Sequence, residues 1–344
     1  EVLGPDAESV ALAWRFPGLA SKDFEVLQVV SQVLYNGKAG LIDLDLNQQQ
    51  KVLNSYGYPM GLADYSAFIL GGLPKQGQML EEVKDLLLNE IKKLRAGEFD
   101  EKMLQANINN FKLYELQSME SNEGRADIFV NSFINGTNWE DEVTAIDRMA
   151  KLTKEDIVAF ADKYLKEDNY AVVYKKQGKD PNEKKMTKPE ITPIVSNRDV
   201  ASPFLTSIQE NAVKPIEPVF LDFKKDMSQL TAKSDIPVLY KQNTTNDLFQ
   251  LIYVFDMGNN NDKALGTAFD YLEYLGTSDM TPEELKSEFY RLACTFYVSP
   301  GNERTYVVLS GLNENMPAAM QLFEKLLADA QVNKEAYDNL VGDI

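Results

Sequence analysis

One strand with a single apolar face, followed by long amphipathic helices in succession, is the pattern that most constrains this fold. Apolar residues occupy every second position of residues 9–16, which predicts a strand with one buried side. Helical spacing follows at 23–35, and a second strand is predicted at 65–73. Further helices are expected at about 41–53, 80–94, 100–120, 124–134 and 157–165, and a short strand at 170–174.

The order of these elements indicates the fold class. Strands and pairs of helices come in runs rather than in strict βαβ alternation. We therefore expect an α+β fold with mostly antiparallel sheets covered by long helices. The length of 344 residues favours two domains, with three possible.

The composition changes after residue 174. Six of the 14 prolines lie between positions 181 and 218, and no apolar period survives there, so we expect a linker at 178–226 without regular secondary structure. The same region is rich in lysine. The cluster could be an anion-binding patch, but a solvated linker against an acidic body is the interpretation we favour. Its members are Lys175, Lys176, Lys179, Lys184, Lys185 and Lys188.

Order resumes after the linker. Strands are predicted at 236–240 and 247–257, helices at 263–275, from 281 onward and at 317–330, and a hairpin at 294–299 and 305–310. The sequence stops within a segment that we expect to be helical. We therefore expect the region 227–344 to be the first part of a domain that continues further.

The amino-acid counts exclude several functions. The chain has no histidine, so Ser-His-Asp triads, Cys-His pairs and His-based zinc sites are excluded. A single cysteine, Cys294, excludes an internal disulfide and fits either a reducing compartment or a Gram-negative periplasm. The net charge of −18 disfavours nucleic-acid binding. No apolar run is long enough to predict a membrane span.

Two local motifs are weak. Asp43 and Asp45 begin like a calcium loop, but Gln48 and Asn54 stand where that loop needs glycine and glutamate, so we expect these acids on a helix surface. Cys294 lies in a half-apolar strand and is expected to be a small core residue rather than a nucleophile. Taken alone, the residues predict no active site.

The order of motifs over residues 1–178 resembles the second domain of a pitrilysin/insulinase-type half-molecule, the fold shared with mitochondrial processing peptidase. Each motif is degenerate alone, but their order and spacing are specific. They are Trp14-Arg-Phe-Pro-Gly18, Leu34-Tyr-Asn-Gly37, Ala39-Gly-Leu41, Leu94-Arg-Ala-Gly-Glu-Phe-Asp100 and Ile146-Asp-Arg-Met-Ala-Lys-Leu-Thr153.

The segment after about 227 resembles the start of the next half of such a molecule. Active members carry His-x-x-Glu-His on a helix there, with two histidines that bind zinc and a glutamate that activates water. Aligned on Leu275-Gly-Thr277, the three positions are Thr267, Asp270 and Tyr271. The resemblance therefore implies a degenerate motif, with no catalytic residue and no metal ligand in this chain.

The resemblance implies an organisation and a role. Residues 1–177 would be the second domain of the first half, 178–226 the linker between halves, and 227–344 the first part of a degenerate second half. The chain would be a non-catalytic portion of a zinc metallopeptidase that degrades or processes peptides, forming chamber wall and substrate-contact surface. The alternative is a fragment of an inactive peptidase-like assembly or peptide-binding subunit.

The same resemblance implies partners and a location. Zinc is expected only in a domain upstream of Glu1, the partners would be a peptide substrate and the parent's other domains, and the family points to the bacterial periplasm or cell envelope. We also expect one helical face to carry all three motif positions, toward the strand ending near Met257. There, the Tyr271 hydroxyl should find a polar partner if it is buried, and Asp270 should stay partly solvated.

Overall fold

A computed structural model describes residues 1–181, 186–194 and 196–343 of the chain. Lys184 and Lys185 of the lysine cluster, and parts of the expected linker, lie outside the described residues. Contacts divide the chain into two units. One contains Glu1–Asp180 together with Thr245–Ile344, and the other is Pro181–Thr244.

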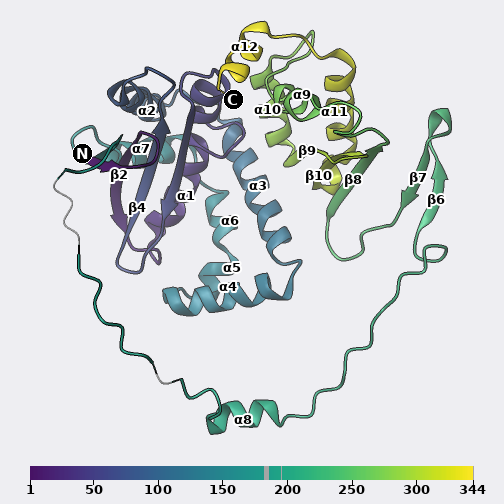
Figure 1. Ribbon diagram of the computed structural model, residues 1–344, viewed down its shortest axis with the longest axis horizontal. Coiled ribbons are helices and arrows are strands. Elements are labelled where there is room, and N and C mark those ends of the chain that lie inside the picture. The colour runs from purple at the N-terminus through teal and green to yellow at the C-terminus, as the bar shows by residue number, and fades with distance from the viewer. Residues whose placement is uncertain (182–185, 195, 344) are drawn as a thin grey trace. The chain divides into compact units, whose positions relative to one another are not determined.

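The first part of the larger unit is built on a five-stranded sheet with the strand order β1-β5-β2-β4-β3 (Figure 1). Only β1 and β5 pair in parallel, and the other neighbours are antiparallel, which confirms a mostly antiparallel α+β arrangement. The strands are β1 (Val2–Gly4), β2 (Ser9–Pro17), β3 (Asn54–Met60), β4 (Tyr65–Leu73) and β5 (Ala171–Gln177).

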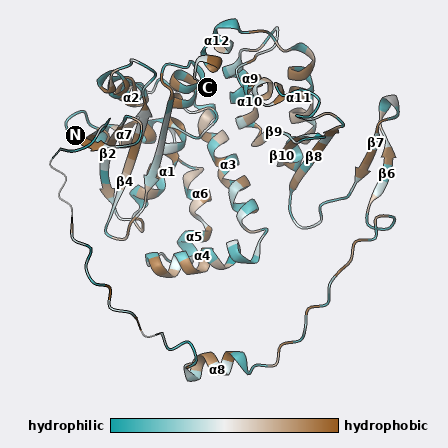
Figure 2. Cartoon of the chain, in the orientation of Figure 1, coloured by the Kyte–Doolittle hydropathy of each residue, from teal (hydrophilic) through white to brown (hydrophobic). Residues whose placement is uncertain are grey.

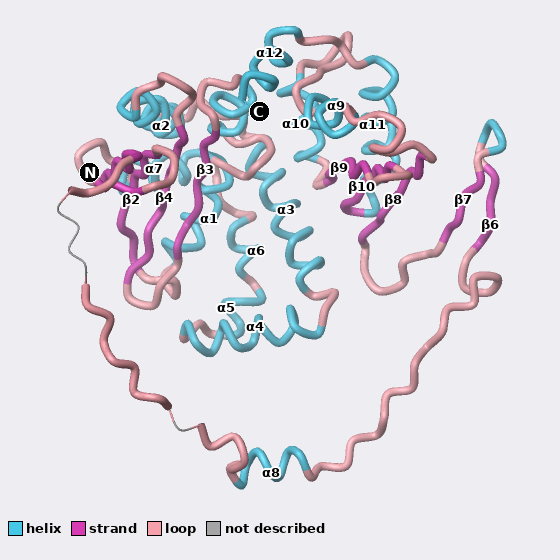
Figure 3. Tube along the Cα trace, viewed as in Figure 1, coloured by secondary structure: helices cyan, strands magenta, loops and turns pink. Residues whose placement is uncertain are grey.

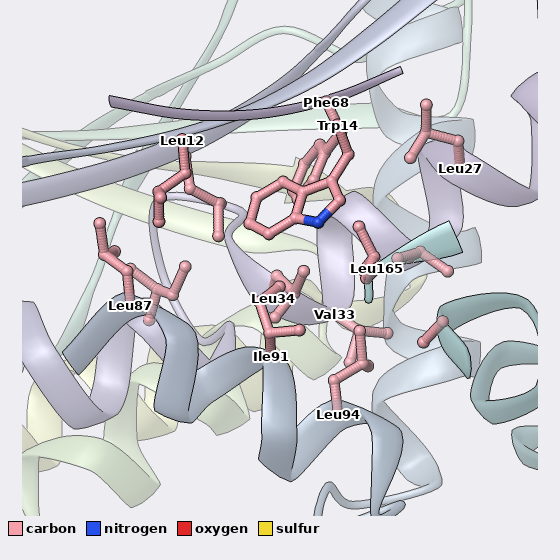
Figure 4. Packing of buried hydrophobic residues seen from close by; sticks show 14 of the residues in the cluster. Leu12, Trp14, Leu27, Val33, Leu34, Phe68, Leu87, Ile91, Leu94 and Leu165 are labelled. Atoms are coloured by element: carbon pink, nitrogen blue, oxygen red, sulfur yellow. The ribbon is translucent and has the colours of Figure 1, made fainter. Parts of the chain in front are cut away.

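Three helices cover one face of this sheet: α1 (Lys22–Leu34), α2 (Leu80–Arg95) and α7 (Lys154–Tyr164). The predicted period-two face of β2 points into this core, where Trp14 packs against Phe68 and donates its indole N–H to the Lys166 carbonyl at 3.2 Å (Figure 4). Burial of large apolar side chains supplies most of the stabilising free energy of such a domain. Figure 4 labels Leu12, Trp14, Leu27, Val33, Leu34, Phe68, Leu87, Ile91, Leu94 and Leu165 in this cluster.

The other helices of this part extend away from the sheet. They are α3 (Lys102–Ser118), α4 (Asn122–Asn135), α5 (Trp139–Val143) and α6 (Ala145–Met149). Phe129 and Phe133 of helix α4 are exposed. Figure 2 colours parts of this helix as hydrophobic. The helix expected at 41–53 is shorter than predicted: a π-helix, η1 (Asp43–Gln48), ends before the unpredicted edge strand β3.

The second part of the larger unit has a three-stranded antiparallel sheet in the order β8-β10-β9. Its predicted strands are confirmed as β8 (Leu248–Phe255), β9 (Cys294–Pro300) and β10 (Thr305–Leu312). A reciprocal cap between Thr281 and Glu284 starts α10, as their spacing predicts. The helices are α9 (Leu265–Leu272), α10 (Pro282–Arg291), α11 (Met316–Asp329) and α12 (Lys334–Asp343).

The smaller unit contains little regular structure. Strands β6 (Ser228–Thr231) and β7 (Pro237–Tyr240) form an antiparallel pair, and α8 (Pro203–Gln209) is a short helix with irregular chain on both sides (Figure 3). The expectation that 178–226 lacks regular secondary structure was wrong for α8, because Ser202 caps its first turn and Pro203 suits the first helical position. Across the described residues, no helix combines the length and apolar character that a bilayer crossing requires.

Candidate functional site

The three motif positions lie on helix α9. Thr267 and Tyr271 are half-buried and Asp270 is exposed. Their spacing of three and four residues places them on neighbouring turns of one helix, as predicted. The apolar residues of the same helix pack inward, and Leu272 is buried in the core of the second part.

The Tyr271 hydroxyl has two polar partners. It donates to the backbone carbonyl of Asn333 at 2.6 Å and accepts from the Asn333 amide at 2.8 Å. Its ring meets that of Tyr337 edge-on, with centroids 5.5 Å apart. The predicted direction of this face, toward the strand ending near Met257, was therefore wrong for Tyr271, because the segment that leads into α12 lies against the tyrosine.

These side chains do not fit a zinc ion. Zinc in proteins is held by imidazole, thiolate and carboxylate groups, and Asp270 is the one such group at the three positions. The Tyr271 oxygen already donates one hydrogen bond and accepts another. Among the residues that the structure describes, no cluster of three histidine, cysteine, aspartate or glutamate side chains could hold a metal ion.

A buried carboxylate lies at the joint between the two parts of the larger unit. One oxygen of Asp43 accepts from the backbone amides of Asn36, Gly37 and Gly40 at 2.8, 3.1 and 3.0 Å. Asp43 is 6% exposed, and burial raises its pKa to about 6. The expected helix-surface position was therefore wrong for Asp43, which instead organises the loop between α1 and η1.

Helix α10 contributes a cation to the same region. Burial lowers the pKa of Lys286, while the charges of Glu273 and Asp43 act in the opposite direction. Lys286 lines a cavity of about 60 Å³ together with Gly37, Phe289, Tyr290 and Cys294. The Cys294 thiol is buried there, and burial raises its pKa to about 11, so it is a protonated side chain rather than a ready nucleophile.

A polar cluster between α3 and α10 completes the joint. The Tyr290 hydroxyl donates to the Asn107 side-chain oxygen at 2.9 Å. The side-chain amide of Asn110 donates to the Tyr290 backbone carbonyl and to the Ala106 carbonyl, at 2.8 Å each. Gln48 on η1 reaches the Glu273 carbonyl at 3.5 Å. These side chains are buried and bridge residues about 180 to 225 positions apart in sequence.

Sequence reasoning did not anticipate this joint. From the sequence, we expect Asp43 on a helix surface and assign no role to Gln48, Asn107 or Asn110. The sequence offers one signal: Asn107 and Asn110 lie beside the apolar residues Ala106 and Ile108 on the buried side of the helix. That signal does not show which partner lies across the interface.

The first part of the chain is similar to a domain of known peptidases. Residues 2–111 match the family model described as the peptidase M16 inactive domain. This match confirms the resemblance of the first part to the pitrilysin/insulinase-type metallopeptidases. The matched model is that of the family's inactive, non-catalytic domain.

Individual proteins are similar to the chain in sequence or fold. Zinc protease PqqE of Helicobacter pylori (strain ATCC 700392 / 26695) is 27% identical over 179 residues, which cover 50% of this chain and 39% of that protein. A solved protease structure from Helicobacter pylori is 21% identical with a TM-score of 0.48, over 51% of this chain and 43% of that chain. The crystal structure of pitrilysin matches 97% of this chain and 38% of its own, at 11% identity and a TM-score of 0.53, which shows a shared fold. The matched stretches thus span about two fifths of the length of these relatives.

Proposed function

We propose that this chain is the non-catalytic portion of a zinc metallopeptidase, forming part of the wall of a chamber that accepts peptides. What supports the proposal is that the positions aligned with the family's zinc motif hold Thr267, Asp270 and Tyr271, on a helix whose Phe269 and Leu272 pack into the core. In this proposal, chemistry occurs in another domain of the parent protein, which holds the zinc ion. The chain itself supplies structure and peptide contact.

The proposed organisation follows the resemblance. Residues 1–177 are the second domain of the first half, 178–226 the linker and 227–344 the first part of the degenerate second half. The buried hydrogen bonds of Asn107 and Asn110 with Tyr290 support a fixed joint between the first and third of these segments. A periplasmic or cell-envelope location in bacteria belongs to the same proposal and rests on the family resemblance.

Two experiments test the proposal. The purified chain, supplied with zinc and a quenched fluorescent peptide, should produce no hydrolysis, and chelator-sensitive cleavage by a contaminant-free sample would contradict it. The gene region that encodes residues before Glu1 distinguishes the two possible parent proteins, an active zinc metallopeptidase and an inactive peptidase-like subunit. An intact His-x-x-Glu-His there supports the peptidase, and its absence supports an inactive assembly or peptide-binding subunit.

A further inference from the structure

Within the described residues of the larger unit, one face of the five-stranded sheet is not covered by a helix. Helices α1, α2 and α7 pack on the face of Leu12 and Trp14, and the intervening residues of β2 therefore point to the opposite face. Among the described residues, this opposite face stays half-buried or exposed along β2, β3, β4 and β5, apart from Gly71. We call it the open face.

Strand register arranges the open face in cross-strand rows. One row joins Val173, Ala11, Gly71 and Tyr56, and the next joins Ala171, Ala13, Ile69 and Tyr58. A third row joins Arg15, Ala67 and Met60. Alanine and glycine therefore occupy most of the middle of the sheet, where Ile69 and Arg15 are the larger residues, and larger side chains also stand on the β3 side.

The larger side chains on the β3 side include the aromatic rings of Tyr56 and Tyr58. An added Cβ at Gly71 would lie 2.2 Å from the Tyr56 ring, so the ring lies directly over the glycine. Tyr56 and Tyr58 stack with centroids 6.1 Å apart. Tyr58 is 46% exposed and Val173 is also 46% exposed, so apolar and aromatic surface remains in contact with water. An uncovered apolar surface of this kind is typical of an interaction site.

Arg15 adds a positive charge at one end of the open face. Its guanidinium lies 5.0 Å from the centroid of the Tyr65 ring. Over the described part of the chain, no carboxylate forms an ion pair with Arg15, although the protein carries 53 acidic residues. A guanidinium oriented on an aromatic ring in this way is suited to bind a carboxylate from another molecule.

The adjacent sheet edge does not favour the addition of a strand. The Asn47 side chain bonds both the amide and the carbonyl of Ser55 on the edge strand β3, at 2.8 Å each. Pro59, two strand repeats further along the same edge, has no N–H to donate. A bound peptide is therefore expected to lie across the open face rather than extend the sheet.

We propose that the open face binds an apolar peptide segment through the Tyr56–Tyr58 rings and the alanine-rich centre, and that Arg15 pairs with a carboxylate of that peptide. This inference rests on the proposed function, because it names the peptide-contact surface and the peptide chemistry of the chamber wall. Charge complementarity selects the occupant: Arg15 has no ion-pair partner among the described residues, whereas Lys175, in the row of Ser9 at the other end of the open face, is paired with Asp6 at 2.8 Å.

The test combines changes in the protein and in the peptide. A fluorescein-labelled peptide of alanine, leucine, tyrosine and serine is made with a free C-terminal carboxylate and as the C-terminal amide. Fluorescence anisotropy measures the affinity of each for the wild type, Arg15→Gln and Tyr58→Ser. Arg125→Gln and Tyr114→Ser are matched controls, because both residues are exposed and lie on other elements.

The expected result is specific. Arg15→Gln weakens binding of the carboxylate peptide by about three- to tenfold and leaves the amide peptide unchanged. Tyr58→Ser weakens both peptides by about threefold or more, and the controls change neither. Matching urea midpoints for the wild type and variants establish that a loss of binding reflects the open face.

Other outcomes separate this inference from the proposed function. Peptide binding that Arg15→Gln and Tyr58→Ser leave unchanged overturns the open-face assignment but keeps a peptide-contact role elsewhere on the chain. No binding of either peptide by the wild type overturns both. A homodimer in sedimentation velocity that Tyr58→Ser dissociates overturns the peptide assignment, because a second copy would then occupy the face.

Discussion

The side-chain amide nitrogen of Asn110 on α3 lies 2.8 Å from the backbone carbonyl oxygen of Tyr290 on α10. The Tyr290 carbonyl lies in the last turn of α10 and also accepts from the Ala293 amide at 3.0 Å, so Asn110 gives it an additional hydrogen bond from another element. Because both residues are buried and lie 180 positions apart, the bond joins the sheet domain to the later part of the chain.

Tyr290→Phe should destabilise this joint. The substitution removes the hydroxyl that donates to Asn107, whose side chain is fully buried and whose amide nitrogen already lacks a partner among the described residues. Leaving a buried acceptor unsatisfied costs about 1–3 kcal/mol of unfolding free energy. Urea unfolding measures the loss, and Tyr297→Phe, at an exposed tyrosine, should change stability by less than about 0.5 kcal/mol.

Asp43 should make stability depend on pH. Burial raises its folded-state pKa from 3.8 to about 6, so the folded protein holds the proton more tightly than the unfolded chain does. The stabilising contribution is therefore complete below pH 3.8 and is lost as pH rises through about 6. The difference of roughly two units corresponds to about 3 kcal/mol.

Asp43→Asn isolates this effect. The difference in unfolding free energy between the variant and the wild type should shift in favour of the variant by up to about 3 kcal/mol between pH 4 and pH 7. Asp270→Asn, at an exposed carboxylate, is the control and should show no comparable shift. A pH-independent difference for Asp43→Asn would contradict the raised pKa.

The sequence predicts a helix or strand of this structure well where a local pattern of residues determines its position. Strand β4 and helix α2 have the predicted bounds to within one residue, because apolar periodicity and flanking glycine or proline mark them. Strand β3 escaped prediction because Gly57 and Pro59 are typical of turns. They are tolerated here because β3 lies at the sheet edge.

The candidate site shows the same difference between features set by the local sequence and features set by distant segments. Helix α9 and the spacing of its three motif positions followed from the sequence, because both are local. The partner of Tyr271 and the burial of Asp43 did not, because each depends on segments distant in sequence. No helical or strand pattern could indicate that Asn333 lies beside Tyr271.

Cys294 should be unreactive in the folded protein. The thiol is 6% exposed and burial raises its pKa to about 11, so about one molecule in a thousand carries the thiolate at pH 8. A chromogenic disulfide reagent should therefore react at least ~100-fold more slowly with the native chain than with the chain in urea. Equal rates in the two conditions would show that the strand β9 opens readily.

Tyr271→Phe should loosen the segment that leads into α12. The hydroxyl bonds both the carbonyl and the amide of Asn333, and the phenylalanine ring keeps the edge contact with Tyr337 but makes neither bond. We expect faster amide hydrogen exchange from 333 through the first turns of α12, because local opening there then breaks fewer contacts. Exchange in β10 and α11 should stay unchanged. Mass spectrometry of peptic peptides measures both regions, and Tyr306→Phe, at an exposed tyrosine of β10, serves as the control. Unaltered exchange at Asn333 would mean that the Tyr337 ring contact, rather than the Tyr271 hydroxyl, holds this segment in place.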